Sequence, residues 1–173
     1  MATMDDKSLF VDTNVLVYAH RREVREHSAA REILSSLAEG RDRWAIPWPC
    51  LYEFFSVVTN PRIWKETVSR PEEASEQIDA WLGSPSLVLL AETRDFWNVL
   101  RALTSRPRVR GPLVHDARVA ALCIAHGIDA LLTRDRDFHL FPDLTIEDPA
   151  SCARTYTIAR IFTLPIYPGG QRS

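Results

Sequence analysis

Short apolar runs alternate with longer stretches of helical periodicity along this chain, and this alternation constrains its fold more than any other feature. The apolar runs, which predict strands, lie at residues 8–11, 44–47, 86–91, 129–133 and 144–146. Apolar residues at helical spacing, with breakers at the ends, lie at 13–19, 29–37, 49–60, from Pro71 onward, at 93–104 and at 113–126. Strands that alternate with helices form a mostly parallel sheet with helices on both faces. The sequence therefore predicts an α/β fold with three layers, in which helices flank a short, mostly parallel sheet.

Length and composition fit one globular domain. A chain of 173 residues can bury a core, and 46% apolar and 25% charged residues are ordinary for a soluble protein. The net charge of -2 and the pI near 6.2 argue against binding to nucleic acid by bulk charge. Any contact with RNA or DNA must come from a local patch.

Cysteine usage and the N-terminus bear on the cellular compartment. The three cysteines lie far apart without a Cys-x-x-Cys pair, which argues against a disulfide framework or a zinc knuckle. The N-terminus has no hydrophobic signal core, and no apolar run approaches the roughly 20 residues of a membrane span. We therefore expect a reduced, cytoplasmic protein with no membrane association.

Four acidic residues stand at the ends of four separate apolar segments. They are Asp12, Glu53, Asp116 and Asp135. Asp12 directly follows a predicted strand, and Asp135 lies just beyond the carboxyl end of another; such carboxyl ends form the ligand-binding edge of these sheets. Asp116 opens a helix, and Glu53 is expected on the apolar side of its helix with no basic residue one turn away. Carboxylates against apolar segments are costly unless a cation lies among them.

Each acidic residue alone also has an ordinary structural explanation. A helix cap explains Asp12 equally well, and a favourable interaction with the helix dipole explains Asp116. Turn chemistry explains one aspartate at Asp135, but it explains the pair Asp135 and Asp137 less readily. The conjunction favours a site, because strand ends and the following helix starts converge on one edge of a sheet. Such a cluster would suit Mg²⁺ or Mn²⁺, which prefer oxygen ligands, activate water and polarise phosphate. Whether one or two ions bind is left open.

Polar residues beside these acids suit a supporting role. Thr13, Asn14 and Thr133 are expected to position the attacking water or to orient the carboxylates.

The acidic motifs resemble those of the PIN-domain family of metal-dependent ribonucleases, and most nearly those of the VapC-type toxins of bacterial toxin–antitoxin pairs. The resembling segments are 10–16, 52–54, 115–117 and 132–138, and they follow the family's order between residue 9 and about 148. The resemblance implies that the metal-binding carboxylates are Asp12, Glu53, Asp116 and Asp135, with Asp137 as a fifth. It also implies endonucleolytic cleavage of RNA, a homodimer, and a small cognate antitoxin that occludes the acidic site.

The resemblance also suggests how the chain is divided. Residues 1–148 are expected to form the PIN-like nuclease domain, and residues 149–173 an extension that packs on this domain or on a partner.

A breaker-rich basic loop at 106–112 precedes Asp116 in the sequence. We expect Arg106, Arg108 and Arg110 of this loop, together with Arg134, to contact the RNA backbone.

Other enzyme classes fit the sequence less well. Receiver domains and haloacid-dehalogenase-like phosphatases need a late lysine, and none follows Lys65. The phosphatases also need a second aspartate where Asn14 stands. Motifs for serine hydrolases, nucleotide binding and zinc peptidases are absent from the sequence. Two alternatives remain: a PIN nuclease outside toxin–antitoxin systems that processes RNA or acts on DNA, and a catalytically silent PIN-like binding domain.

Overall fold

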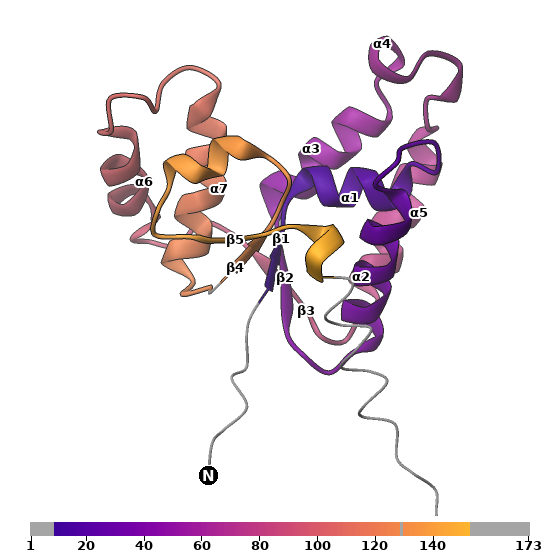
Figure 1. The fold of residues 1–173 in the computed structure, drawn as a ribbon, viewed down its shortest axis with the longest axis horizontal. Helices are drawn as coiled ribbons and strands as arrows, with labels where there is room; N and C mark the ends of the chain where they lie inside the picture. The colour runs from indigo at the N-terminus through magenta and orange to yellow at the C-terminus, as the bar shows by residue number, and fades with distance from the viewer. Residues whose placement is uncertain (1–8, 129, 153–173) are drawn as a thin grey trace, which may run out of the picture.

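The computed structural model describes residues 9–128 and 130–152, and these form a parallel sheet between two groups of helices (Figure 1). The strands are β1 (Leu9–Val11), β2 (Trp44–Pro47), β3 (Leu87–Leu90), β4 (Ala130–Leu132) and β5 (Thr145–Glu147). The helices are α1 (Thr13–His20), α2 (His27–Glu39), α3 (Trp48–Val58), α4 (Pro61–Trp64), α5 (Pro71–Leu82), α6 (Phe96–Thr104) and α7 (Leu113–Ala125). There are also two 3-10 helices, η1 (Lys65–Thr67) and η2 (Arg136–Leu140).

The sheet has the strand order β3-β2-β1-β4-β5, and each neighbouring pair is parallel. The chain moves outward from β1 to β2 and β3, and then returns to place β4 on the other side of β1. The direction of winding therefore reverses between β1 and β4, and ligands of open α/β sheets bind outside the carboxyl ends of strands at such a point. Topology alone directs attention to the residues that follow β1 and β4.

The three-layer α/β fold predicted from the sequence is confirmed. α6 and α7 lie on one side of the sheet, and α1, α2 and α5 on the other (Figure 1). Phe10, Ile46 and Leu131 of the central strands are fully buried in the core. The buried alanines of α7, Ala117 and Ala120, allow this helix to approach the sheet closely.

Two helix boundaries differ in detail from the predicted ranges. The helix expected at 93–104 begins at Phe96, whose backbone N–H donates a hydrogen bond to the carbonyl oxygen of Thr93 in the preceding turn. The helix expected at 49–60 does stop before its breaker, because α3 ends at Val58, but α4 begins again at Pro61. Asn60 accepts a hydrogen bond from the backbone of Arg62, and proline suits a first helical position, so the same dipeptide ends one helix and starts another.

Some predicted features lie outside the described residues. They are residue 8 and Asp129 at the starts of two strands, and all of the 149–173 extension beyond residue 152. Residues 149–152 form a helical turn with Cys152 buried, and Asp148 caps this turn by accepting a hydrogen bond from the backbone of Ala150. Within the described part of the chain, no helix has both the length and the apolar character needed to cross a membrane.

Candidate metal-binding active site

Asp12 lies at the point where the winding of the sheet reverses. Asp12 directly follows β1, and its backbone N–H donates a hydrogen bond to the carbonyl of Leu132 at the end of β4. The residue is buried, with only 6% of its surface exposed to solvent. Asp12 Oδ1 accepts a hydrogen bond from Thr13 N at 2.7 Å. The carboxylate thus caps α1, and it also stands where the topology places a ligand site.

Asn14 and Thr133 fix the other oxygen of this carboxylate. Asp12 Oδ2 accepts hydrogen bonds from Asn14 Nδ2 at 2.6 Å and from Thr133 Oγ1 at 2.7 Å. Thr133 Oγ1 in turn accepts from Asn14 Nδ2 at 2.8 Å and from Asp135 N at 3.0 Å. One threonine hydroxyl therefore connects Asp12 to the backbone of Asp135. This is the carboxylate-orienting contact that the sequence suggested for Asn14 and Thr133.

Glu53 is exposed, contrary to the expectation that it points to the apolar side of its helix. Cys50 and Phe54 hold the buried side of α3, and Glu53 lies beside it. Thr13 Oγ1 donates a hydrogen bond of 2.7 Å to Glu53 Oε2. The partner of Glu53 is thus a hydroxyl at the start of α1, which brings this carboxylate toward Asp12.

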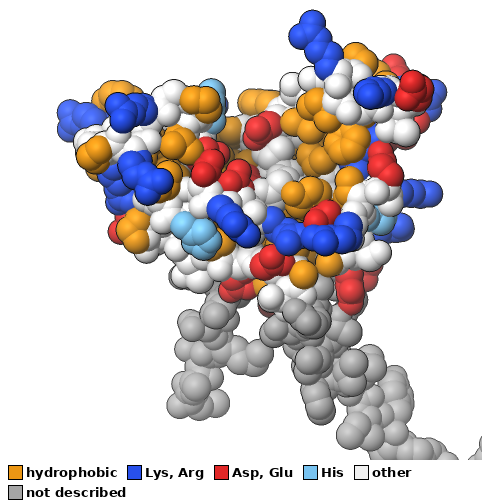
Figure 2. Space-filling model, turned by 45° about the horizontal axis from the view of Figure 1, so that its top comes forward, with side chains coloured by type: hydrophobic (Ala, Val, Ile, Leu, Met, Phe, Trp, Pro, Cys, Tyr) orange, Lys and Arg blue, Asp and Glu red, His pale blue; other side chains and the backbone are white. Residues whose placement is uncertain are grey.

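The remaining acids come from α7 and η2. Asp116 is half-buried near the start of α7, and Asp135 and Asp137 are exposed at the start of η2. Asp135 Oδ1 accepts a hydrogen bond from Asp137 N at 2.9 Å, so turn chemistry does explain part of this motif. Figure 2 shows acidic side chains gathered in a hollow between the lobe of α6 and α7 and the lobe of α3 and α4. We call this hollow the acidic cleft and define it by the five residues Asp12, Glu53, Asp116, Asp135 and Asp137.

The pKa of Asp12 is raised from 3.8 to about 7. Burial is the main cause, and the nearby charges of Glu53 and Asp135 add to it. Hydrogen bonds from Thr133 and Thr13 act in the opposite direction, because they stabilise the ionised carboxylate. The neighbouring acids are therefore close enough to interact with Asp12.

The pKa of Asp116 is raised from 3.8 to about 6. Burial is again the largest cause, followed by the charges of Asp135, Asp137 and Glu53. Glu53 and Asp135 thus act on both Asp12 and Asp116, which places all five carboxyl groups in one electrostatic neighbourhood.

The donor set fits a hard divalent cation, although it does not enclose one completely. None of the five carboxylates of the acidic cleft forms an ion pair with a described residue. Among residues 9–128 and 130–152, no three His, Cys, Asp or Glu side chains form a ready group of metal ligands. Mg²⁺ commonly binds through one or two carboxylates and keeps several waters, so an open, all-oxygen cleft suits it.

Cys50 also contacts the site, which its apolar sequence context did not indicate. The buried Cys50 Sγ lies 3.8 Å from Asp12 Oδ1 and donates a weak hydrogen bond to it. Burial, and then the charge of Asp12, raise the pKa of this thiol. Cys50 therefore remains protonated and serves as a donor to Asp12.

The predicted RNA-binding arginines fall into two groups. Arg106 donates to the carbonyl of Leu140 at 3.1 Å and pairs with Asp143 at 2.7 Å, so it connects its loop to η2. Arg108 and Arg110 are exposed and form no ion pair within the described part of the chain.

Arg134 belongs with the engaged arginines. It pairs with Glu26 at 2.8 Å and with Asp148 at 3.2 Å. Glu26 precedes Arg134 by 108 residues in the sequence, and Asp148 lies after the 132–138 motif. No local sequence pattern therefore indicated either ion pair.

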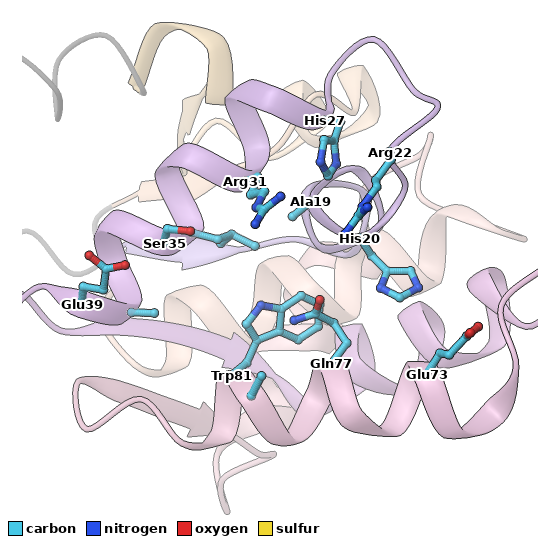
Figure 3. Close-up of a pocket in the computed structure, with 13 residues that line it drawn as sticks. Ala19, His20, Arg22, His27, Arg31, Ser35, Glu39, Glu73, Gln77 and Trp81 are labelled. Carbon is cyan, nitrogen blue, oxygen red and sulfur yellow. The ribbon is translucent and has the colours of Figure 1, made fainter.

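A second hollow lies near the other end of α1. Its volume is about 610 Å³, and residues of α1, α2 and α5 line it. In Figure 3, Arg22, His27 and Arg31 gather on one rim, opposite Gln77 and Glu73. Its lining includes none of the predicted site residues. The predicted metal-binding carboxylates therefore lie outside this second hollow.

Comparison with known proteins identifies the class to which this fold and cleft belong. The PIN domain family matches residues 9–144, and the chain belongs to this family. Ribonuclease VapC43 of Mycobacterium tuberculosis is 36% identical over 141 residues, which cover 82% of this chain and 95% of that protein. Ribonuclease VapC48 of the same species is 33% identical over 140 residues, which cover 81% and 96%. The resemblance inferred from the acidic motifs is thereby confirmed.

Solved structures show the same fold. VapBC2 from Rickettsia felis, bound to a DNA fragment from its promoter, matches with a TM-score of 0.56 at 21% identity and covers 81% of this chain and 97% of that one. VapC20 of Mycobacterium tuberculosis, described as a sarcin-ricin loop cleaving toxin, matches with a TM-score of 0.58 at 19% identity and covers 76% and 93%.

Proposed function

We propose that this protein is a divalent-metal-dependent endoribonuclease and the toxin of a type II toxin–antitoxin pair. The observation that carries this proposal is the acidic cleft, where carboxylates without an ion-pair partner among the described residues meet at the point where the winding of the sheet reverses. The names of the relatives support it, because VapC43 and VapC48 are both ribonucleases and align over most of this chain.

Asp12, Glu53, Asp116 and Asp135 are the proposed ligands of Mg²⁺ or Mn²⁺, with Asp137 as a fifth. When bound, such an ion polarises a phosphoryl oxygen and lowers the pKa of a bound water.

The protein's own residues set the geometry for that chemistry. Asn14 and Thr133 fix the orientation of Asp12, and Thr13 holds Glu53 toward it. Arg108 and Arg110 are the best candidates for phosphate contacts, since both are exposed and neither is engaged in an ion pair with a described residue. Arg106 and Arg134 are already paired, and we assign them to shaping the rims of the acidic cleft.

The partners follow from the same class of protein. The structures of VapBC2 from Rickettsia felis and VapBC-1 from nontypeable Haemophilus influenzae are named as VapBC complexes. We propose that this chain likewise pairs with a small cognate antitoxin and forms a homodimer.

Cleavage of a labelled RNA pool by the purified protein tests the proposal. We expect cutting with Mg²⁺ or Mn²⁺, no cutting with EDTA, and no cutting by Asp12→Ala or Asp116→Asn. Asp79→Asn is the matched control, because Asp79 is an exposed aspartate on α5 outside the acidic cleft. Cleavage that persists in EDTA, or in both cleft variants, would contradict the proposal.

A further inference from the structure

We propose that Tyr52 positions the RNA substrate by stacking on a nucleobase at the rim of the acidic cleft. This inference rests on the proposed ribonuclease function and adds to it a contact that recognises bases, not phosphates.

Tyr52 is unusually open for a large aromatic residue. It is 63% exposed, although it belongs to a well-formed helix, α3. Its ring stacks on Trp48, one helical turn earlier, with 5.8 Å between ring centroids and 26° between ring planes. Trp48 is half-buried and packs against the core. The two stacked rings, which we call the aromatic step, leave much of Tyr52 in solvent while Trp48 packs against it.

This aromatic step lies beside the acidic cleft. Tyr52 immediately precedes Glu53, whose carboxylate accepts the hydrogen bond from Thr13 and acts electrostatically on both Asp12 and Asp116. In Figure 2, hydrophobic side chains gather on the lobe of α3 and α4, next to the hollow that contains the acidic side chains. A nucleotide beside the reacting phosphate can therefore lie over α3.

The charge of the chain favours such a contact. The acidic cleft repels a polyanion unless a metal ion is bound there, and the whole chain carries a net charge of -2, so bulk attraction for RNA is absent. Affinity for a single strand must then come from local arginines and from uncharged contacts to bases. Stacking on an aromatic ring supplies an uncharged contact to a base. It tolerates different bases, because each base has a π-face.

The chain supplies a matched control for exposure. Trp97 on α6 is 62% exposed, nearly the same fraction as Tyr52, but it has no ring partner among the described residues. Figure 1 shows α6 on the outer side of its lobe, on the other side of α7 from α3. Removing the Trp97 ring therefore removes an exposed aromatic group without touching the rim of the acidic cleft.

The test is the cleavage kinetics of the full-length protein on a fluorescently labelled RNA that the wild type cuts. We expect Tyr52→Ala to raise KM about ten-fold while kcat stays within about two-fold, because stacking binds the substrate and does not take part in the chemistry. Tyr52→Phe keeps the ring and should retain the wild-type KM. Trp97→Ala should match the wild type, and light scattering should give the same mass for all four proteins.

Three results would overturn the inference. An unchanged KM in Tyr52→Ala would show that the ring does not contact substrate. A smaller mass for Tyr52→Ala would show that this surface joins two copies of the chain instead. An equal loss in Trp97→Ala would make the effect nonspecific. Failure of the proposed function looks different, since the wild type itself would then cut no RNA with metal present.

Discussion

At the scale of single residues, the acidic cleft is built around Asp12. Its carboxylate accepts hydrogen bonds from Thr13, Asn14 and Thr133 and lies near Glu53 and Asp135, so it is oriented by donors and destabilised by burial and neighbouring charge. The donors hold the group in place, and the uncompensated charge favours the cation that we propose for this site.

The hydroxyl of Thr133 provides a first prediction. Thr133→Ala removes the donor to Asp12 and the acceptor for Asp135 N, and we expect RNA cleavage to fall by about 10–100-fold, the usual effect of losing such an orienting partner. Thr133→Ser keeps a hydroxyl and should retain most activity. Equal rates for the alanine and serine variants, measured with saturating metal, would show that the hydroxyl does not orient the site.

The raised pKa values predict how the stability of the metal-free protein depends on pH. The pKa of Asp12 is about 7 in the folded state and 3.8 without the protein's influence, so the folded state binds this proton more tightly than the unfolded state. The resulting stabilisation is complete below about pH 4 and is lost as the pH rises through 7. Asp116 acts in the same direction, with its loss near pH 6.

The measurement is the melting temperature in EDTA of the wild type and of Asp116→Asn between pH 5 and 8. His20 has a lowered pKa, mainly because of burial, and so opposes the trend at low pH in both proteins. The melting temperature of the wild type minus that of Asp116→Asn isolates the contribution of Asp116 to stability. This difference should favour the wild type most at pH 5 and decline toward pH 8. A difference that stays constant or rises with pH would contradict this sign. Mg²⁺ should stabilise the wild type most at pH 8.

At the scale of elements, the loop between α6 and α7 carries arginines with different roles. Arg106 joins this loop to η2, the element that presents Asp135 and Asp137, while Arg108 and Arg110 extend from it unpaired with any described residue. The loop is thus attached to η2 and Asp143 through Arg106, while Arg108 and Arg110 remain exposed.

Substitution separates these roles. Arg106→Ala should lower stability by about 1–2 kcal/mol, because it leaves the Leu140 carbonyl and Asp143 without their partner.

The double variant Arg108→Ala/Arg110→Ala should leave stability unchanged and weaken RNA binding. It should also reduce the slope of log affinity against log salt by about one for each phosphate that is no longer neutralised. Thermal unfolding and anisotropy titrations at several salt concentrations measure these effects. A salt slope equal to that of the wild type would remove these two arginines from the RNA-binding surface.

Periodicity and breakers allowed most elements to be predicted, because the signals are local. The helix expected at 29–37 extends to His27–Glu39, and the strand expected at 44–47 has the bounds that were predicted. α4 could not be predicted, since four residues are too short for periodicity and Asn60–Pro61 serves both as a stop and as a start.

The sequence predicted the acidic residues of the candidate site and the neighbours of Asp12, but not the contacts of Glu53 and Arg134. Glu53 accepts a hydrogen bond from Thr13, 40 residues away, and Arg134 donates one to Glu26, 108 residues away. Local patterns do not contain such contacts.

At the scale of the whole molecule, strand order gives the site its position. β4 returns beside β1 after the chain has passed through β2 and β3, so residues more than 100 positions apart meet at Asp12 and Thr133. Membership of the PIN domain family then links this geometry to the relatives VapC43 and VapC48.

The proposed toxin function makes a prediction in cells. Induced expression should arrest bacterial growth, because metal-dependent RNA cleavage would deplete an essential RNA. Asp12→Ala should abolish the arrest at equal protein level, and Asp79→Asn should not. Growth arrest by Asp12→Ala as strong as that of the wild type would separate toxicity from the acidic cleft and favour a role in binding alone.

Binding of Mn²⁺ to the acidic cleft is the most direct test of the central claim. Electron paramagnetic resonance reports the free ion during titration of the purified, metal-free protein. We predict that the wild type binds Mn²⁺, that Asp12→Asn and Asp116→Asn bind it much more weakly, and that the rate of RNA cleavage follows occupancy. Equal Mn²⁺ binding by all three proteins would show that these carboxylates do not hold the metal.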